Sequence, residues 1–194
     1  MTGVQTCALP ILAQNGIRRL HDRVKDMADC VKGLSAPPNF ALCAVGPVVL
    51  EVFHTLQVLA RDKQITLRTD GLDSLPEFHA DERRLYNALY NLINNAIPET
   101  PPGGSITVRV HLDQDTGSIA LAVADTGRGM SPEIRDRLFS ANAVSTKKGG
   151  TGLGTKIVKD VVDTHKGKIW VESEPGVGTT FHLRFPLDPT IRHS

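Results

Sequence analysis

The chain has 194 residues, and its 22 basic and 21 acidic side chains leave a net charge of +1. A balance so near zero does not support a nucleic-acid or membrane-surface partner, because both usually leave a basic footprint in the sequence. No apolar run approaches the roughly 20 residues that span a bilayer. The three cysteines are odd in number and lack metal-ligand spacing, which fits a reduced, cytoplasmic compartment.

The first eleven residues, MTGVQTCALPI, read like the translation of a common sequencing adapter from a GTG start codon. We therefore treat residues 1–11 as a non-native segment and leave them out of the fold prediction. The alternative is a genuine short leader. This stretch, however, has no basic residues at its start, and its apolar part is too short for a secretory signal.

Residues 12–35 are predicted to carry an amphipathic helix, whose apolar side chains recur at helical spacing from Ile17 to Leu34. Such an apolar stripe needs a partner, either a neighbouring helix or a second subunit. Pro37 and Pro38 end the helix, because proline lacks a backbone donor and disfavours helix in the residue before it. We place a domain boundary at this break.

The second domain is predicted to cover residues 39–188 and to leave residues 189–194 as a tail. Its expected strands are residues 40–45, 65–68, 105–112, 118–124, 168–173 and 179–185, and its expected helices are 47–62, 82–97, 131–138 and 153–165. Asp81 is a good N-cap for the second helix, and Pro98, Pro101, Pro102 and the glycine pair after them are expected to end it. Because hairpins join most strands, the pattern predicts an α+β fold with two layers, a sheet with helices on one face.

The helix predicted over residues 82–97 carries a polar stripe beside its buried apolar stripe. Asn87, Asn91 and Asn95 recur every four residues, with Asn94 next to them. Asparagine is a poor helix former, so four in one helix cost stability unless something outside the helix uses them. An amide oxygen is a neutral, hard ligand that suits Mg²⁺ held together with phosphate oxygens. The alternative is a solvated polar face.

One acid and two glycines follow the strand predicted over residues 118–124. Asp125 can accept a hydrogen bond from an exocyclic amine, such as the N6 amine of adenine. Gly127 and Gly129 let the backbone turn and come close to a flat ligand. The alternative is an ordinary Asp-Thr-Gly turn.

The segment from Phe139 to Gly154 combines two lysines with four glycines just before a predicted helix. Successive backbone N–H groups at a helix N-terminus bind anions, and Lys147 and Lys148 add charge for a triphosphate. The segment is not a P-loop, because its lysines precede its glycines. Taken alone, a glycine-rich loop of this kind is usually a flexible surface linker.

The order of these parts resembles the ATP-binding domain of sensor histidine kinases. That is the Bergerat-type fold, with a mixed, mostly antiparallel sheet, shared with type-two topoisomerases, mismatch-repair ATPases and one chaperone family. The resemblance covers roughly residues 39–187. Residues 90–96 look like the family's N-box, 124–130 like its first glycine box, 138–139 like its F-box, 150–154 like its second glycine box and 176–181 like the last box.

The resemblance implies a role for each matching residue. Asn95 would ligate Mg²⁺, and Asn91 would support the metal and the phosphates. Asp125 would read adenine, with Thr179 holding Asp125 or its bound water. Besides these four, the implied ATP-binding residues are Gly127, Gly129, Lys147, Gly150, Thr151, Gly152, Leu153 and Gly154, the last six in a lid that closes over the phosphates.

Two residues depart from the family pattern. Members often carry a basic residue three positions after the metal-binding asparagine, where this chain has Pro98. The residue after the second glycine box is usually apolar, and here it is Thr155. The first departure weakens the expected phosphate contact, for which Lys147 would have to compensate.

The resemblance further implies a catalytic part of a two-component sensor histidine kinase. Such an enzyme transfers the γ-phosphate of ATP to a histidine on a dimerising helical hairpin, and from there to an aspartate of a response-regulator receiver domain. His21 is the tempting phosphoacceptor, but between it and the first strand at Phe40 there is no room for a full returning helix. We therefore expect residues 12–35 to be the end of the returning arm and the phosphoacceptor to be missing. His165 closes the last helix, where a cation would suit the helix dipole.

Two other functions stay open on the same fold. One is an anti-sigma-type serine kinase, although such proteins usually begin with the nucleotide domain itself. The other is a non-catalytic ATP-binding scaffold, which Pro98 and Thr155 keep open. The mechanical ATPases on this fold carry a catalytic glutamate just before the metal-binding asparagine. Residues 91–94 include no glutamate, so we do not expect ATP hydrolysis to be the main activity.

Overall fold

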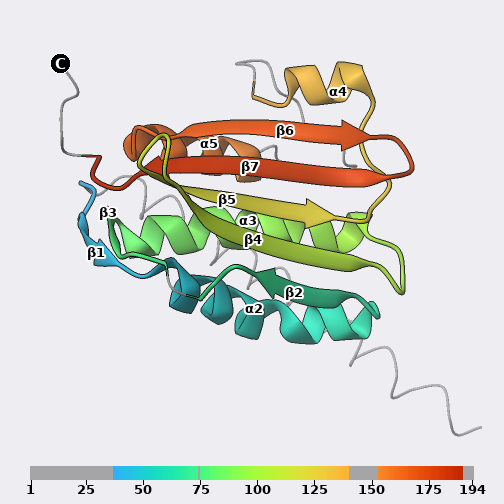
Figure 1. Cartoon of the computed structure of the whole chain (residues 1–194). Helices are drawn as coiled ribbons and strands as arrows, with labels where there is room; N and C mark the ends of the chain where they lie inside the picture. Colours follow the sequence, from blue (N-terminus) through green and yellow to red (C-terminus); the bar gives the residue numbers. More distant parts are fainter. Residues whose placement is uncertain (1–36, 74, 140–152, 190–194) are drawn as a thin grey trace, which may run out of the picture. The chain divides into compact units, whose positions relative to one another are not determined.

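A five-stranded sheet spans the domain (Figure 1). The computed structural model describes residues 37–73, 75–139 and 153–189. In order across the sheet, the strands are β2 (Thr66–Asp70), β4 (Ser105–Asp113), β5 (Ser118–Asp125), β7 (Gly178–Pro186) and β6 (Lys168–Glu174). Only β2 and β4 pair in parallel, so the sheet is mixed and mostly antiparallel, as predicted.

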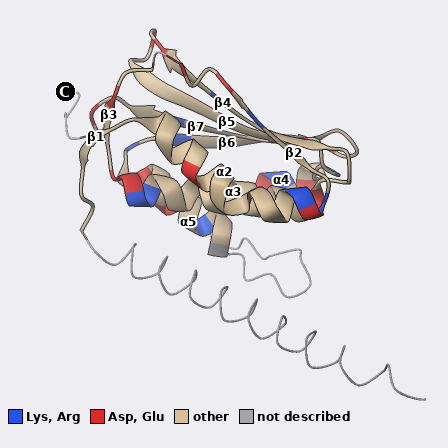
Figure 2. Cartoon of the chain, turned by 90° about the horizontal axis from the view of Figure 1, so that it is seen from below, with Lys and Arg blue, Asp and Glu red and all other residues tan. Residues whose placement is uncertain are grey.

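Three long helices cover one face of this sheet (Figure 2). They are α2 (Val45–Asp62), α3 (Glu82–Glu99) and α5 (Leu153–Thr164), while the short α4 (Pro132–Arg137) lies next to β6. The predicted arrangement of two layers, with helices on a single face, is therefore confirmed. None of the helices in the described part of the chain is long and apolar enough to cross a membrane.

The core lies between the sheet and the three helices. Every second residue of the central strands points into it, because side chains alternate between the two faces of a strand. The fully buried members include Ile106, Val108, Ile119, Leu121, Leu183 and Phe185 from the sheet, and Val49, Val52, Leu85, Leu89, Ile93 and Val161 from the helices. Each such side chain contributes about 1.5–3 kcal/mol by leaving water. This burial fixes the distance between α3 and β5, the two elements that carry most of the predicted site.

Two helix boundaries that involve a proline differ from the prediction. α2 begins at Val45 rather than at Pro47, which lies in the first turn. There the missing N–H of proline has no acceptor within the helix in any case. α3 continues through Pro98 and ends at Glu99, two residues past the predicted end and just before Pro101 and Pro102. Pro98 itself therefore does not end the helix.

The last turn of α3 is closed from beyond its proline. Pro98 removes only the hydrogen bond that its own N–H would donate to the carbonyl of Asn94. The backbone N–H of Thr100 still donates to the carbonyl of Ala96 at 3.0 Å, and the hydroxyl of Thr100 donates to the same carbonyl at 2.9 Å. At the other end, Asp81 caps the helix as predicted, since its carboxylate accepts the N–H of Arg84 at 3.0 Å.

A second, two-stranded sheet was not predicted. It pairs β1 (Ala41–Cys43) with β3 (Phe78–Ala80) in an antiparallel arrangement. β3 lies between the predicted strand at residues 65–68 and the predicted helix at residues 82–97, where no strand was expected, because three residues are too few to display an alternation. Its conformation is set by long-range partners instead, including a hydrogen bond from the N–H of His79 to the carbonyl of Leu187 at 2.8 Å.

The described chain from residue 38 onward forms one compact unit. Residues 1–11 and the helix expected within residues 12–35 lie outside the described residues. Their assignment to an adapter-derived segment and to a hairpin arm stays a prediction.

Candidate functional site

Asp125 ends β5 and begins the turn that the sequence singled out. One oxygen of its carboxylate accepts the N–H of Gly127 at 2.8 Å, and Thr179 lies opposite it in the register with β7. Burial raises the pKa of Asp125, and the charge of Glu99 acts in the same direction, while hydrogen bonds from the backbone N–H groups of Gly127 and Thr179 partly offset the rise. The result is a half-buried acid at a strand end, held by backbone donors.

Glycine is required at two positions of this turn by contacts within the protein. A Cβ at Gly127 would lie 2.6 Å from the carboxylate of Asp125 and 2.7 Å from the carbonyl of Glu99. Gly129 has a φ of +66°, and a Cβ there would lie 2.0 Å from the carbonyl of Glu174. The sequence predicted that these glycines bring the backbone close to a ligand, and in the structure they bring it close to other parts of the protein's own backbone. Room for a ligand ring is a further role that stays a prediction.

The last hairpin is joined tightly to this turn. A Cβ at Gly178 would lie 2.1 Å from the carbonyl of Asp125, so the start of β7 needs glycine where it passes the end of β5. The hydroxyl of Ser173 accepts the N–H of Met130 at 2.8 Å, and it lies 2.9 Å from the hydroxyl of Thr179. Sequence reasoning missed Ser173. Its only local signal is a polar side chain on the core-facing side of β6, opposite Thr179.

The two asparagines predicted to serve the metal and phosphates meet the start of α5. A Cβ at Gly154 would lie 2.9 Å from Nδ2 of Asn95 and 3.1 Å from Oδ1 of Asn91. The side chain of Asn91 is held in place by a hydrogen bond from its Nδ2 to the carbonyl of Asn87 at 2.7 Å. Gly154 therefore lets the N-terminus of a helix lie directly against two side-chain amides.

The last turn of α3 joins the asparagines to the Asp125 turn. Glu99 continues the spacing of Asn91 and Asn95 along the helix, one turn further on. Its carbonyl accepts the N–H of Arg128 at 3.2 Å, and its carboxylate forms an ion pair with the guanidinium of Arg128. The structure thus brings the predicted adenine reader and the predicted metal ligand to the same end of α3.

Part of the predicted site lies outside the described residues. This applies to Lys147, Gly150, Thr151 and Gly152, and to the side chain of Leu153, whose backbone begins α5. The closure of this lid over phosphates stays a prediction. Phe139, at the start of the segment, packs edge-on against Phe181 of β7, with ring centroids 6.4 Å apart.

The chemistry of the donor set fits magnesium better than a softer metal. Within the described residues, no group of three or more histidine, cysteine or acidic side chains could hold a metal ion. The amides of Asn91 and Asn95 supply neutral oxygens instead, and such ligands suit Mg²⁺ when phosphate oxygens complete its octahedral shell. The N-terminus of α5, which lies beside these amides, would also favour the binding of the phosphate groups.

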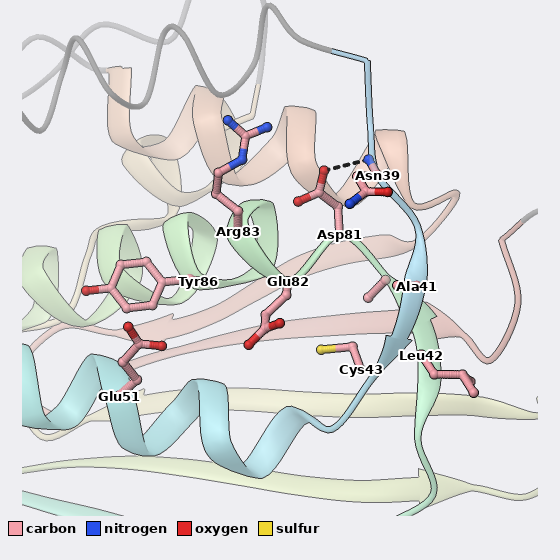
Figure 3. A pocket seen from close by; sticks show the side chains of 10 residues that line it. Asn39, Ala41, Leu42, Cys43, Glu51, Asp81, Glu82, Arg83 and Tyr86 are labelled. Carbon is pink, nitrogen blue, oxygen red and sulfur yellow. Dashed lines mark hydrogen bonds between the residues drawn. The ribbon is translucent and has the colours of Figure 1, made fainter.

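A separate hollow lies at the opposite end of α3 (Figure 3). It has a volume of about 450 Å³, and its lining includes Leu42, Cys43, Glu51, Glu82 and Tyr86. Of the predicted ATP-binding residues that the structure describes, none lines it. Burial raises the pKa of the Cys43 thiol to about 11, with the charges of Glu82 and Glu77 adding to the rise, so this thiol stays protonated and unreactive at neutral pH.

His165 requires a correction, since a cation at the end of α5 was expected here. The side chain is only 1% exposed, and burial lowers its pKa. Its Nε2 accepts the N–H of Asp81 at 3.0 Å, so its Nδ1 carries the hydrogen that is donated to the carbonyl of Val161 at 2.8 Å. The imidazole is therefore neutral and serves packing, because a protonated Nε2 could not accept a hydrogen bond.

Comparison with known families gives one match that covers most of the second domain. The family described as "Histidine kinase-, DNA gyrase B-, and HSP90-like ATPase" matches residues 80–189. This range contains the asparagine helix, the Asp125 turn and the last hairpin.

Similar proteins and structures point to one group within that family. The chain is 32% identical over 187 residues to the adaptive-response sensory kinase SasA of Synechococcus elongatus, covering 93% of this chain and 48% of the relative. The catalytic domain of the histidine kinase ThkA superposes with a TM-score of 0.70 at 29% identity, covering 79% of this chain and 99% of that domain. Full-length ShkA in complex with AMPPNP superposes with a TM-score of 0.75 at 28% identity, covering 96% of this chain and 39% of ShkA. The chain thus spans about half the length of SasA.

Proposed function

Because the chain belongs to the histidine kinase-, DNA gyrase B- and HSP90-like ATPase family, we propose that it binds Mg²⁺-ATP and is the catalytic ATP-binding part of a sensor histidine kinase. One observation carries the proposal. α3 holds two amides against the N-terminus of α5 at one point and packs against the turn after Asp125 one helical turn later. In this arrangement the carboxylate of Asp125 can bind the base of a nucleotide, and the two amides together with the N-terminus of α5 can bind its phosphates.

Asp125 is assigned to the adenine ring. A carboxylate can accept the N6 amine of adenine, and partial burial strengthens that hydrogen bond because the surroundings are less polarisable than water. Thr179 lies opposite in the register and is assigned to hold Asp125 or a water bound to it. Gly127 and Gly129 are assigned to leave room for the adenine ring, because they carry no side chain.

Asn95 is assigned to the metal, and Asn91 to the metal and the phosphates. When bound, Mg²⁺ withdraws negative charge from the phosphate oxygens it contacts. The N-terminus of α5 supplies backbone N–H groups and a favourable dipole for the same phosphates. Lys147, which lies outside the described residues, is assigned to the phosphate contact that Pro98 cannot make.

Phosphoryl transfer needs mainly position and charge stabilisation from the enzyme. We assign both to this domain and place the acceptor histidine on a dimerising hairpin beyond the described residues, with residues 12–35 as its returning arm. A response-regulator receiver domain as the final acceptor, homodimerisation through the hairpin and a cytoplasmic location are parts of the same proposal. They rest on the sequence resemblance and on the named kinases among the similar proteins.

A direct test measures Mg²⁺-ATP binding to the chain by calorimetry and then phosphotransfer to an added hairpin that carries an acceptor histidine. We expect binding that depends on Asp125, very little autophosphorylation by the chain alone, and a label on the added hairpin that is stable to base and labile to acid. Bound ATP without any transfer would support the non-catalytic scaffold. A label on serine would support the anti-sigma-type kinase.

A further inference from the structure

Three polar side chains form a row across one end of the sheet, on the neighbouring strands β5, β7 and β6 (Figure 1). Asp125 lies opposite Thr179 in the register, and Thr179 lies opposite Ser173. Asp125 and Thr179 share a strand face with Val123 and Leu183, which are buried in the core, so the row points toward the helices. The proposed function uses Asp125 and Thr179 but gives Ser173 no role.

The hydroxyl of Ser173 is occupied by groups of the protein itself. Its oxygen accepts the N–H of Met130 at 2.8 Å, and its hydrogen is donated to the carbonyl of Gly178 at 3.0 Å. A third contact joins it to the hydroxyl of Thr179 at 2.9 Å. A serine hydroxyl has one hydrogen and two lone pairs, so these partners use its full capacity. Ser173 can therefore act on a ligand only through its neighbours.

The same partners fix the direction of the hydrogen bond between the two hydroxyls. The carbonyl of Gly178 can only accept, so it takes the one hydrogen of Ser173. The N–H of Met130 takes one lone pair, and the lone pair that remains accepts the hydrogen of Thr179. The hydroxyl hydrogen of Thr179 is thus turned toward β6, and its oxygen has only lone pairs to offer a ligand.

This direction matters because Asp125 lies on the other side of Thr179. The backbone N–H of Thr179 donates to the carboxylate of Asp125, so the acid is held without the hydroxyl. Side chains directly opposite each other on paired strands have Cβ atoms about 4.5–5.5 Å apart. An ionised carboxylate can only accept, so the row presents two acceptors side by side. Such a pair suits a group that donates two hydrogens, as the exocyclic amine of adenine does.

We propose that Ser173 is a positioning residue that holds Thr179 as a hydrogen-bond acceptor beside Asp125, so that the two side chains accept both hydrogens of the 6-amino group of a nucleotide base. By accepting the N–H of Met130, the same hydroxyl fastens the end of the glycine turn to β6. The inference rests on the proposed function, because it takes Asp125 as the group that contacts the base.

The test compares two nucleotides on Ser173→Ala, Thr179→Val and the double variant. The nucleotides are Mg²⁺-ATP and Mg²⁺-purine riboside triphosphate, whose base carries hydrogen in place of the amine, and calorimetry measures both affinities. We expect Ser173→Ala to bind ATP about tenfold more weakly and the analogue at most about twofold more weakly, because only ATP has the second amine hydrogen to lose. Thr179→Val should lose ATP affinity to a similar extent, and adding Ser173→Ala to it should cause no further loss.

A second measurement follows the anchoring of the turn without any nucleotide. Hydrogen exchange of the Met130 amide should become about tenfold faster in Ser173→Ala, because that N–H loses its acceptor. Ser173→Thr keeps the hydroxyl and should restore both the exchange rate and the ATP affinity. Ser118→Ala is the matched control, since it removes a buried serine hydroxyl that pairs with Thr116 at 2.6 Å at the other end of β5. It should change neither measurement.

The outcomes separate this inference from the proposed function. Thermal unfolding first checks that each variant is folded. Equal losses for the two nucleotides in Ser173→Ala, or an unchanged ATP affinity in that folded variant, would overturn the positioning role. An unchanged exchange rate of Met130 would overturn the anchoring of the turn. If the unmodified chain bound neither nucleotide, the proposed function would fail, and the role of Ser173 in nucleotide binding would fail with it.

Discussion

The two ends of α3 differ in whether their polar groups stabilise the fold. At its N-terminal end, Asp81 and Arg84 are 2% and 3% exposed and form an ion pair at 3.5 Å. The carboxylate of Asp81 also accepts the N–H groups of Asn39 and Arg84, and its own N–H donates to His165. Most polar groups there have a partner within the protein, although Nε of Arg84 takes part in the ion pair and in no hydrogen bond with the described residues. This end therefore stabilises the fold once it has formed.

The C-terminal end of α3 carries features that cost stability. It has asparagines at helix positions, a proline in its last turn, and a neighbouring acid whose ionisation is opposed by burial and by Glu99. Glycines in the turn after Asp125 pack closely against neighbouring backbone atoms and so allow α3, the turn and the last hairpin to lie in contact. The contrast agrees with the proposed function, in which the C-terminal end binds a nucleotide, because groups arranged for a ligand remain unfavourable until it binds.

The largest effect on folding is expected from the N-terminal end. Asp81→Ala leaves Arg84 buried without its nearest carboxylate and removes the helix cap, so the free energy of unfolding should fall by about 3–5 kcal/mol. Denaturant titration measures this loss, and Mg²⁺-ATP affinity below the unfolding transition should change by about threefold or less.

Two further variants make that result interpretable. Asp81→Asn keeps a capping side chain without the charge and should lose less stability than Asp81→Ala. Asp136→Ala, in the exposed α4, should change the free energy of unfolding by about 0.5 kcal/mol or less. If Asp81→Ala proved as mild as Asp136→Ala, the N-terminal end would have no special role in folding.

Asp125→Asn is expected to separate function from stability. The amide keeps an oxygen that can accept the N–H of Gly127, but it offers the nucleotide a weaker, neutral acceptor, so Mg²⁺-ATP affinity should fall roughly 30-fold, or about 2 kcal/mol. At neutral pH the variant should also be more stable than the parent chain, because ionising a buried acid with a raised pKa opposes folding. Calorimetry and thermal unfolding test both statements, and a less stable variant with unchanged affinity would contradict them.

Gly154→Ala probes the contact between α5 and the amides. The added Cβ would press on Asn91 and Asn95, whose side chains can shift by a few tenths of an ångström. Affinity for Mg²⁺-ATP should therefore fall about tenfold, or about 1.4 kcal/mol. Gly46→Ala in α2 is the matched control, since its Cβ would have only ordinary contacts at 3.8 Å or more from Leu72. Both glycines are the second residue of their helix, so any gain in helix propensity is matched between the variants, and only Gly154→Ala should lose affinity.

The smallest expected effect is the pH dependence of stability from His165. Its native pKa is lowered by burial, so between that value and about 6.5 the unfolded chain binds more protons than the native protein. Its contribution to stability is complete above about pH 6.5 and is lost as pH falls through the native pKa. His165→Gln should flatten this part of the stability curve, as measured by denaturant titration from pH 7.5 to 5. An unchanged slope would show that other groups titrate there.

The order of α3, the Asp125 turn and the last hairpin was predictable, since each has a local signature. Periodicity placed the helix, Asp81 marked its start, and two glycines after an acid marked the turn. Pro98 was misleading, because a hydroxyl and an N–H beyond it close the helix end. β3 has no local signature, because its pairing partners come from distant parts of the chain.

The charge of His165 and the roles of Ser173 and Arg128 could not be read from the sequence. Each depends on a partner brought near by the fold: the N–H of Asp81 for His165, Met130 and Thr179 for Ser173, and the end of α3 for Arg128. A polar residue in a strand or turn looks the same in the sequence whether or not such a partner exists.

Local spacing and backbone preference were enough to specify most of the helices and strands, with β3 as the exception, and the residue types that accompany the turns. The contacts of Asn91 and Asn95 with Gly154, and of Glu99 with Arg128, arise only in the folded protein. Such meetings depend on how the sheet is registered and how the core seats α3 against β5. The free energy that sets this packing is summed over many buried side chains rather than carried by any short motif.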